Sequence, residues 1–272
     1  MTDSPDDLAG SAPPSGTLPT HSAQTDVMVP VTAEDVAREK RRRILKWGGI
    51  LAAIALTGGL LYKRSVDALH AQESYDAGVR FLESARYPAA ILSFDRAIDL
   101  KSDFVQAYLM RGKASVANGQ LSQAIVDFTG VLKLQPRSTQ ALLERGAVNL
   151  ELKKFQLAAD DAGQAIAIDP KLAAAYNLRG MALRSMGSAG QALADFNRAV
   201  ELAPNDDNYF QRGVTYQGLG RHNLAIADFD QVIQFRPDGA SAYFARAESR
   251  RALGDLPGAR KDHEQGRILD GR

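Results

Sequence analysis

The sequence contains no cysteine, and this absence excludes several kinds of chemistry. Without thiols the chain has no disulfide, no thiolate metal site and no cysteine nucleophile. Histidine is also scarce, since the four residues lie far apart in the sequence and match no metal-ligand spacing. We therefore expect solvated imidazoles on helix surfaces, no metal site and no cofactor.

An excess of charge of either sign is also missing. The chain has 33 Lys and Arg residues against 32 Asp and Glu residues, so its formal net charge is +1. It shows no basic stripe with interleaved aromatic residues, which is the usual signature of a nucleic-acid-binding surface. It also shows no Ser/His/Asp set, phosphate-binding loop or metal cluster. We expect neither an enzyme nor a nucleic-acid-binding protein.

Residues 1–33 lack Lys and Arg, hold four Asp, and are rich in Pro, Ser, Thr, Ala and Gly. They show no apolar periodicity, so they cannot bury enough surface to offset the conformational entropy of the chain. We predict a disordered acidic tail.

The charge reverses in residues 34–46, a basic juxtamembrane segment in this interpretation. Residues 44–62 are then apolar except for Lys46, whose long side chain can reach lipid headgroups. At 1.5 Å per residue this stretch spans roughly 28 Å, which is just enough for a bilayer core. Trp47 and Tyr62 lie near its two ends, as interfacial anchors do. We predict one transmembrane helix over residues 44–62.

A buried core helix and a cleaved signal peptide are the alternatives to a membrane helix. No surrounding apolar sequence is available to bury a core helix. Lys63 and Arg64 follow the run where a signal peptide would have a small-x-small cleavage site. We favour an uncleaved anchor, in which Gly49, Ala53 and Thr57 form a weak small-xxx-small row for pairing two anchors.

Flanking cations predict the orientation of this anchor. Six lie within nine residues on its N-terminal side, and two lie directly after it. The positive-inside rule then places the N-terminal tail in the cytoplasm and everything after Lys63 on the far side of the membrane.

An Arg-Gly pair recurs downstream at nearly constant spacing. The glycine, or an alanine in its place, stands at residues 78, 112, 146, 180, 213 and 247, in steps of 34, 34, 34, 33 and 34. Such a period is typical of a solenoid. We predict an all-α solenoid over residues 71–272, built from six helix-turn-helix units: 71–104, 105–138, 139–172, 173–206, 207–239 and 240–272.

We number positions within a unit so that this glycine is position 8. Position 20 is Ala in all six units, and position 32 is Pro in units two to five, where it ends the second helix. A glycine inside a helix costs about 1 kcal/mol relative to alanine, so we expect a close crossing of the two helices at position 8. Position 24 is Phe except for Ala162, which is expected to weaken unit three, and His263, which with Gly266 is expected to form a polar end-cap.

These positions resemble the tetratricopeptide repeat family. The resemblance implies antiparallel helix pairs stacked into a right-handed superhelix, with a concave groove lined by the first helices that binds protein or peptide partners without identifying them. Repeats with Arg-Gly and Asp-Phe pairs also resemble bacterial proteins. The expected location is therefore the bacterial inner membrane, with the N-terminus cytoplasmic and the repeats periplasmic.

Arg at position 7 and Asp at position 23 occur together in units two to six, and unit one has neither. The arginines could form a cationic stripe for an anionic ligand, or each could pair with the aspartate of its own unit. Their joint presence and joint absence favour a structural ion pair. The expected pairs are Arg111–Asp127, Arg145–Asp161, Arg179–Asp195, Arg212–Asp228 and Arg246–Asp262.

Under the geometry that the resemblance implies, positions 2, 5, 9 and 12 face the groove. No unit has Lys at position 5 with Asn at position 9, so a clamp for a partner's terminal carboxylate is not expected. We expect apolar contacts with an extended or helical peptide, or else packing of several of these side chains between units. The candidate groove residues are Lys113, Asn177, Met181, Arg184, Phe210, Gln217 and Phe244.

The leading functional hypothesis is a membrane-tethered scaffold for protein partners in cell-envelope assembly. The alternative is a homo-oligomeric platform that assembles through the anchor and the solenoid. The last unit is rich in Arg but also carries acidic residues, which favours a self-paired, solvated cap over an anion site.

Overall fold

The computed structural model describes residues 32–271, and the chain divides into two parts, Met1–Leu60 and Leu61–Arg272. Within residues 32–271 the secondary structure is helical, with no strand. The predicted acidic tail lies outside the described residues, apart from Thr32 and Ala33.

The first part contains the beginning of helix α1 (Ala33–Glu83). Thr32 and Asp35 form a reciprocal cap at its start, in which the Asp35 amide donates to Thr32 Oγ1 and the Thr32 hydroxyl donates to Asp35 Oδ2. The side chains of residues 44–62 are all exposed. By length and composition, this helix is able to cross a membrane.

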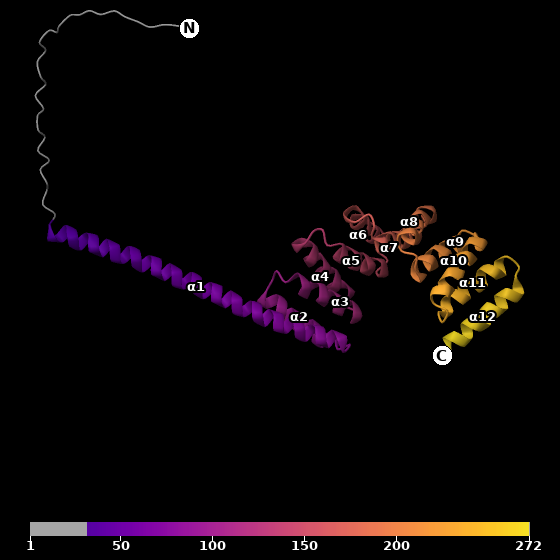
Figure 1. The fold of residues 1–272 in the computed structure, drawn as a ribbon, viewed down its shortest axis with the longest axis horizontal. Helices are drawn as coiled ribbons and strands as arrows, with labels where there is room; N and C mark the ends of the chain where they lie inside the picture. Colours follow the sequence, from indigo (N-terminus) through magenta and orange to yellow (C-terminus); the bar gives the residue numbers. More distant parts are fainter. Residues whose placement is uncertain (1–31, 272) are drawn as a thin grey trace, which may run out of the picture. The chain divides into compact units, whose positions relative to one another are not determined.

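The second part is a row of antiparallel helix pairs that pack in chain order (Figure 1). The end of α1 pairs with the second helix, and the first helices α5, α7, α9 and α11 contact one another in succession. The structure confirms the all-α solenoid of helix-turn-helix units. Its helices are α2 (Tyr87–Leu100), α3 (Val105–Ala117), α4 (Leu121–Leu134), α5 (Thr139–Glu151), α6 (Phe155–Ile168), α7 (Ala173–Ser185), α8 (Ala189–Leu202), α9 (Asp206–Gly218), α10 (His222–Phe235), α11 (Ala240–Ala252) and α12 (Leu256–Asp270).

Helix boundaries follow from local sequence. Each proline at position 32 lies two residues after the end of a second helix, as Pro136 does after α4. The turn between the two helices of a unit needs a positive φ, and Gly119 supplies it at +73°. Ala85 and Lys153 adopt the same conformation at +55° and +58°. Helix α9 begins at Asp206, one residue before the predicted start of unit five.

The glycine at position 8 makes room for an aromatic ring. A Cβ atom added at Gly78 would lie 2.6 Å from Cε1 of Phe94, and one at Gly112 would lie 2.6 Å from Cε1 of Phe128. These rings are fully buried, as are those of units four and five. The predicted close approach is therefore between a glycine and a ring, and not between two helix backbones.

The packing around the glycine differs in units three and six. In unit three, Leu178 from the following unit takes the place of the missing ring, with its Cδ2 atom 2.8 Å from an added Cβ of Gly146. In unit six, Gly266 faces the ring of Phe244, 2.7 Å from Cε1 by the same measure. Gly266 is thus a buried packing residue, and its predicted role in a polar end-cap is wrong, whereas His263 is exposed.

Candidate functional site

The recurring arginines lie between successive second helices, each against the aspartate of its own unit. The shortest N···O distances are 2.5 Å for Arg111–Asp127, 2.6 Å for Arg145–Asp161, Arg179–Asp195 and Arg246–Asp262, and 2.7 Å for Arg212–Asp228. Each arginine donates from both Nε and Nη2, which gives the planar fork that suits a carboxylate. The structure brings together the two members of every predicted pair.

These pairs are held in a largely dry environment. The five aspartate side chains are at most 8% exposed. Burial raises the pKa of the Asp127 carboxyl, and the bonds from Arg111 oppose that rise. The bond to Asp262 raises the pKa of the Arg246 guanidinium. Because these charges already have partners inside the fold, they do not form an open stripe for an anionic ligand.

In four of these arginines the remaining terminal nitrogen, Nη1, donates a hydrogen bond to the side chain at position 25 of the preceding unit. This contact was not predicted. Its acceptors are Asp95 at 2.5 Å, Thr129 at 3.1 Å, Asn197 at 3.2 Å and Asp230 at 2.6 Å. Each of these arginines therefore links two consecutive units. The residue type varies at position 25, so repetition in the sequence did not reveal the contact.

Arg179 is the exception in this series. Position 25 of the preceding unit is Gly163, and within residues 32–271 the side-chain hydrogen bonds of Arg179 go only to Asp195. Its side chain is 33% exposed, compared with 14% for Arg111 and Arg246. A Cβ atom added at Gly163 would meet nothing within 4 Å. Gly163 therefore weakens α6 with no packing reason among its described neighbours.

Replacing Gly163 with aspartate is expected to raise the free energy of unfolding by about 1 kcal/mol. The variant removes a helical glycine and gives Arg179 the acceptor that Arg111 and Arg246 have. Urea unfolding measures the gain at low and at high salt. Gly163→Ala is the matched control, because it improves the helix without adding a carboxylate. The gain of Gly163→Asp should shrink at high salt while that of the alanine variant persists; equal salt responses would contradict the ion pair.

All four polar groove candidates are bonded to a neighbouring unit. Arg184 donates to the Gln211 carbonyl at 3.0 Å and to its side chain at 2.7 Å, and burial lowers the pKa of the Arg184 guanidinium. Gln217 donates to the Ala245 carbonyl at 3.2 Å. These contacts correspond to the alternative interpretation, in which the candidates pack between units.

Two further polar candidates behave in the same way. The buried Asn177 amide donates to Asn208 at 2.6 Å in the next unit, and Lys113 pairs with Glu144 at 3.0 Å. Both polar groups therefore bond across junctions between units, and the Lys113 side chain is 35% exposed.

The apolar groove candidates remain partly exposed. Phe210 packs on the ring of Phe229 with centroids 5.8 Å apart, and Phe244 packs on His263 at 5.3 Å. Phe210, Phe244 and Met181 are each half-buried. They are the part of the predicted groove that has apolar surface left for a partner.

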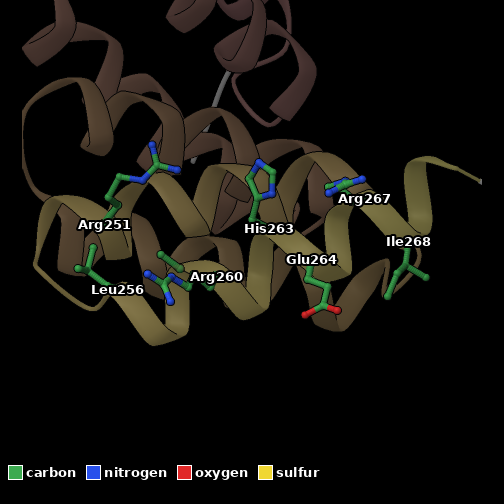
Figure 2. A pocket seen from close by; sticks show the side chains of 8 residues that line it. Arg251, Leu256, Arg260, His263, Glu264, Arg267 and Ile268 are labelled. Atoms are coloured by element: carbon green, nitrogen blue, oxygen red, sulfur yellow. The ribbon is translucent and has the colours of Figure 1, made fainter.

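A concave surface that was not predicted lies on the outer face of the last unit. It has a volume of about 740 Å³, and Figure 2 shows its side chains along α12, together with Arg251 from the end of α11. Leu256 and Ile268 at its ends are about half exposed. Its lining residues are Arg251, Leu256, Ala259, Arg260, His263, Glu264, Arg267 and Ile268.

The charges of this last unit are only partly self-paired. Arg250 contacts Asp262 at 2.7 Å, and Arg251 contacts Glu248 at 3.3 Å. Arg260 and Arg267 make no ion pair with any carboxylate of residues 32–271. The same described residues contain no group of three His, Cys, Asp or Glu side chains placed to hold a metal ion.

The fold is shared with solved proteins of low sequence identity. A tetratricopeptide repeat protein from Parabacteroides merdae aligns with a TM-score of 0.63 at 18% identity, over 85% of this chain and 91% of its own. MamA from Desulfovibrio magneticus aligns with a TM-score of 0.57 at 23% identity, over 62% and 96%. YrrB, described as having an unusual peptide-binding site, aligns with a TM-score of 0.51 at 20% identity, over 65% and 91%.

No curated protein matches the chain. Family models do match it, over most of the solenoid. Models of the tetratricopeptide repeat match residues 75–128, 109–173, 173–206 and 210–267. These matches cover more than half of the chain, and the helix pairs, the period and the glycine–phenylalanine packing agree with them. The chain belongs to the tetratricopeptide repeat family.

Proposed function

We propose that this protein is a membrane-tethered scaffold that holds protein partners on its solenoid. The observation that carries the proposal is the combination of a tetratricopeptide repeat solenoid with an exposed apolar run in α1. Proteins of this family generally mediate protein–protein interactions, and a structural neighbour is described as having a peptide-binding site. Burial of the apolar run in lipid would remove a large apolar surface from water.

The proposed topology is a single pass through a bacterial inner membrane. The six cations before the run favour a cytoplasmic N-terminus, which places the repeats on the periplasmic side. There the partners would be components of cell-envelope complexes. The proposed contact surface is the half-buried row of Met181, Phe210 and Phe244, which suits the apolar side chains of a peptide.

Two charges placed in the apolar run test the anchor. Ile54→Arg with Leu56→Arg is expected to move the protein from the carbonate-resistant membrane fraction to the soluble fraction, because each arginine costs about 3 kcal/mol at the centre of a bilayer. The two side chains are 60% and 68% exposed, so the solenoid is unaffected. Leu92→Arg is the control, since Leu92 is 71% exposed on α2 and should leave the protein in the membrane. Extraction of the wild-type protein from membranes by carbonate would refute the membrane anchor.

Orientation and partner binding need separate measurements. Protease added to intact spheroplasts should degrade the repeats, and protection until lysis would reverse the topology. Phe210→Ser with Met181→Ser should abolish the recovery of cross-linked partners from membranes. Unchanged recovery would exclude this surface.

Self-association of the solenoid is a second candidate function. It is favoured by a specific observation. The exposed surface of the first unit carries Glu73, Asp76 and Glu83, whereas that of the last unit carries Arg260 and Arg267.

A further inference from the structure

Each internal junction of the solenoid buries the same positions. Position 3 of the first helix is packed beside positions 27 and 28 of the preceding unit, as Ala175 is beside Ala165 and Ile166. Position 10 is packed beside positions 20 and 24, as Ala114 is beside Ala90 and Phe94. In units two to six these two positions are at most 3% exposed: Ala107, Ala141, Ala175, Asn208 and Ala242, and Ala114, Val148, Ala182, Thr215 and Ser249.

The first unit has no preceding unit to cover it, and its front surface is mainly acidic. Position 3 is Glu73, position 6 is Asp76 and position 10 is Arg80, and all three are exposed. Glu83 follows one turn later and is also exposed. None of these four residues makes an ion pair within residues 32–271. We call this surface of α1 the front face.

The last unit shows the opposite charge on its outer surface. Positions 21, 24 and 28 are apolar in units one to five, where the next unit covers them. In unit six they become Arg260, His263 and Arg267, with Glu264 as the one carboxylate beside them. We call this surface of α12 the rear face; it is the concave surface in Figure 2.

A solubilising cap needs only to be polar, and it can use either sign or a mixture. Here the front face is acidic with one cation, and the rear face is basic with one carboxylate. Leu256 and Ile268 also leave apolar surface at both ends of the rear face, which suits a helix better than it suits a small anion.

We infer that the solenoids stack head to tail, with the front face of one copy of this chain seated on the rear face of another. The internal junctions define the register. Position 3 then places Glu73 opposite Arg267, and position 6 places Asp76 opposite His263. Position 10 places Arg80 beside Ala259 and His263, so the complementarity rests on the carboxylates of Glu73 and Asp76 against the basic rear face.

Such an interface joins two different surfaces of the same chain, so it extends into open rows unless the rotation closes a ring. It is built mainly from exposed charges, so it is weak and sensitive to salt. Any tether that concentrates the chains on one surface would raise their effective concentration and favour the rows. The inference requires neither the membrane anchor nor a peptide in the groove.

The test is the mass of the full-length protein in detergent, measured by light scattering and sedimentation. The wild type is expected to grow in mass with protein concentration at low salt and to return to a monomer at high salt. Arg260→Glu with Arg267→Glu should remain monomeric at every concentration. Lys133→Glu with Lys171→Glu is the matched control, because it makes the same charge change on exposed residues away from both end faces.

Charge reversal on both faces separates stacking from general damage to the fold. Adding Glu73→Arg and Asp76→Arg to the Arg260→Glu/Arg267→Glu chain restores opposite charges across the interface, and should restore growth in mass. A wild type that is monomeric at low salt overturns the inference. Oligomers that persist in every variant would assign association to another surface, such as the apolar run, and would overturn it equally.

Discussion

Asp127→Ala is expected to lower the free energy of unfolding by about 3–5 kcal/mol, because it leaves the guanidinium of Arg111 without its main partner in a largely buried position. The Asp127 side chain is fully buried and accepts from Nε and Nη2 of Arg111. Urea or guanidinium unfolding followed by circular dichroism measures the loss.

Asp95→Ala is the matched control for that variant. Asp95 accepts from the same arginine at 2.5 Å, but its side chain is 43% exposed, so its loss should cost below about 1 kcal/mol. If the two alanine variants lose equal stability, burial does not decide the strength of these contacts.

The double variant Arg111→Met/Asp127→Leu distinguishes a structural ion pair from a ligand site. Replacing both charges with apolar side chains removes the stranded charge, so most of the stability lost in Asp127→Ala should return. If the double variant is as unstable as Asp127→Ala, the ion pair itself stabilises the fold, beyond the neutralisation of the two buried charges.

The second large effect is expected at the junction of units three and four. Leu178→Ala should lower the free energy of unfolding by about 2–5 kcal/mol, because the side chain is 8% exposed and fills the space over Gly146 that a ring fills elsewhere. Leu219→Ala, at a position 41% exposed, is the control and should cost much less.

Ala162→Phe restores the residue that four other units have at position 24, yet it should destabilise the protein by about 1–3 kcal/mol. The new ring would compete with Leu178 for one space. Combining Ala162→Phe with Leu178→Ala removes the competition, so the double variant should be more stable than either single variant. If Ala162→Phe alone is stabilising, Leu178 does not occupy the aromatic site.

The ion pairs inside each unit could be predicted from the sequence, whereas the contacts to the preceding unit could not. The joint presence of Arg and Asp in five units predicted partners that the structure places within 2.7 Å, because both residues belong to one unit and recur with it. The acceptor at position 25 belongs to the preceding unit and varies in type. No repeated pattern marked it.

The groove residues illustrate the same limit. Positions 5, 9 and 12 differ between units, and such variation suits either a ligand or an irregular junction. The side chain of Arg184 bonds to Gln211 in the next unit, and that of Asn177 bonds to Asn208. The sequence alone does not show whether such a side chain is free or hydrogen-bonded, because this depends on the packing of two adjacent units.

The sequence by itself determined the helix pairs, their period and the contacts inside each unit, because a spacing of 34 residues repeats the same local geometry along the chain. Tertiary structure decided the contacts between units: Leu178 over Gly146, the open position beside Arg179 and the basic rear face of α12. Those contacts join residues of different units, so they depend on how neighbouring helices stack and on where the stack ends.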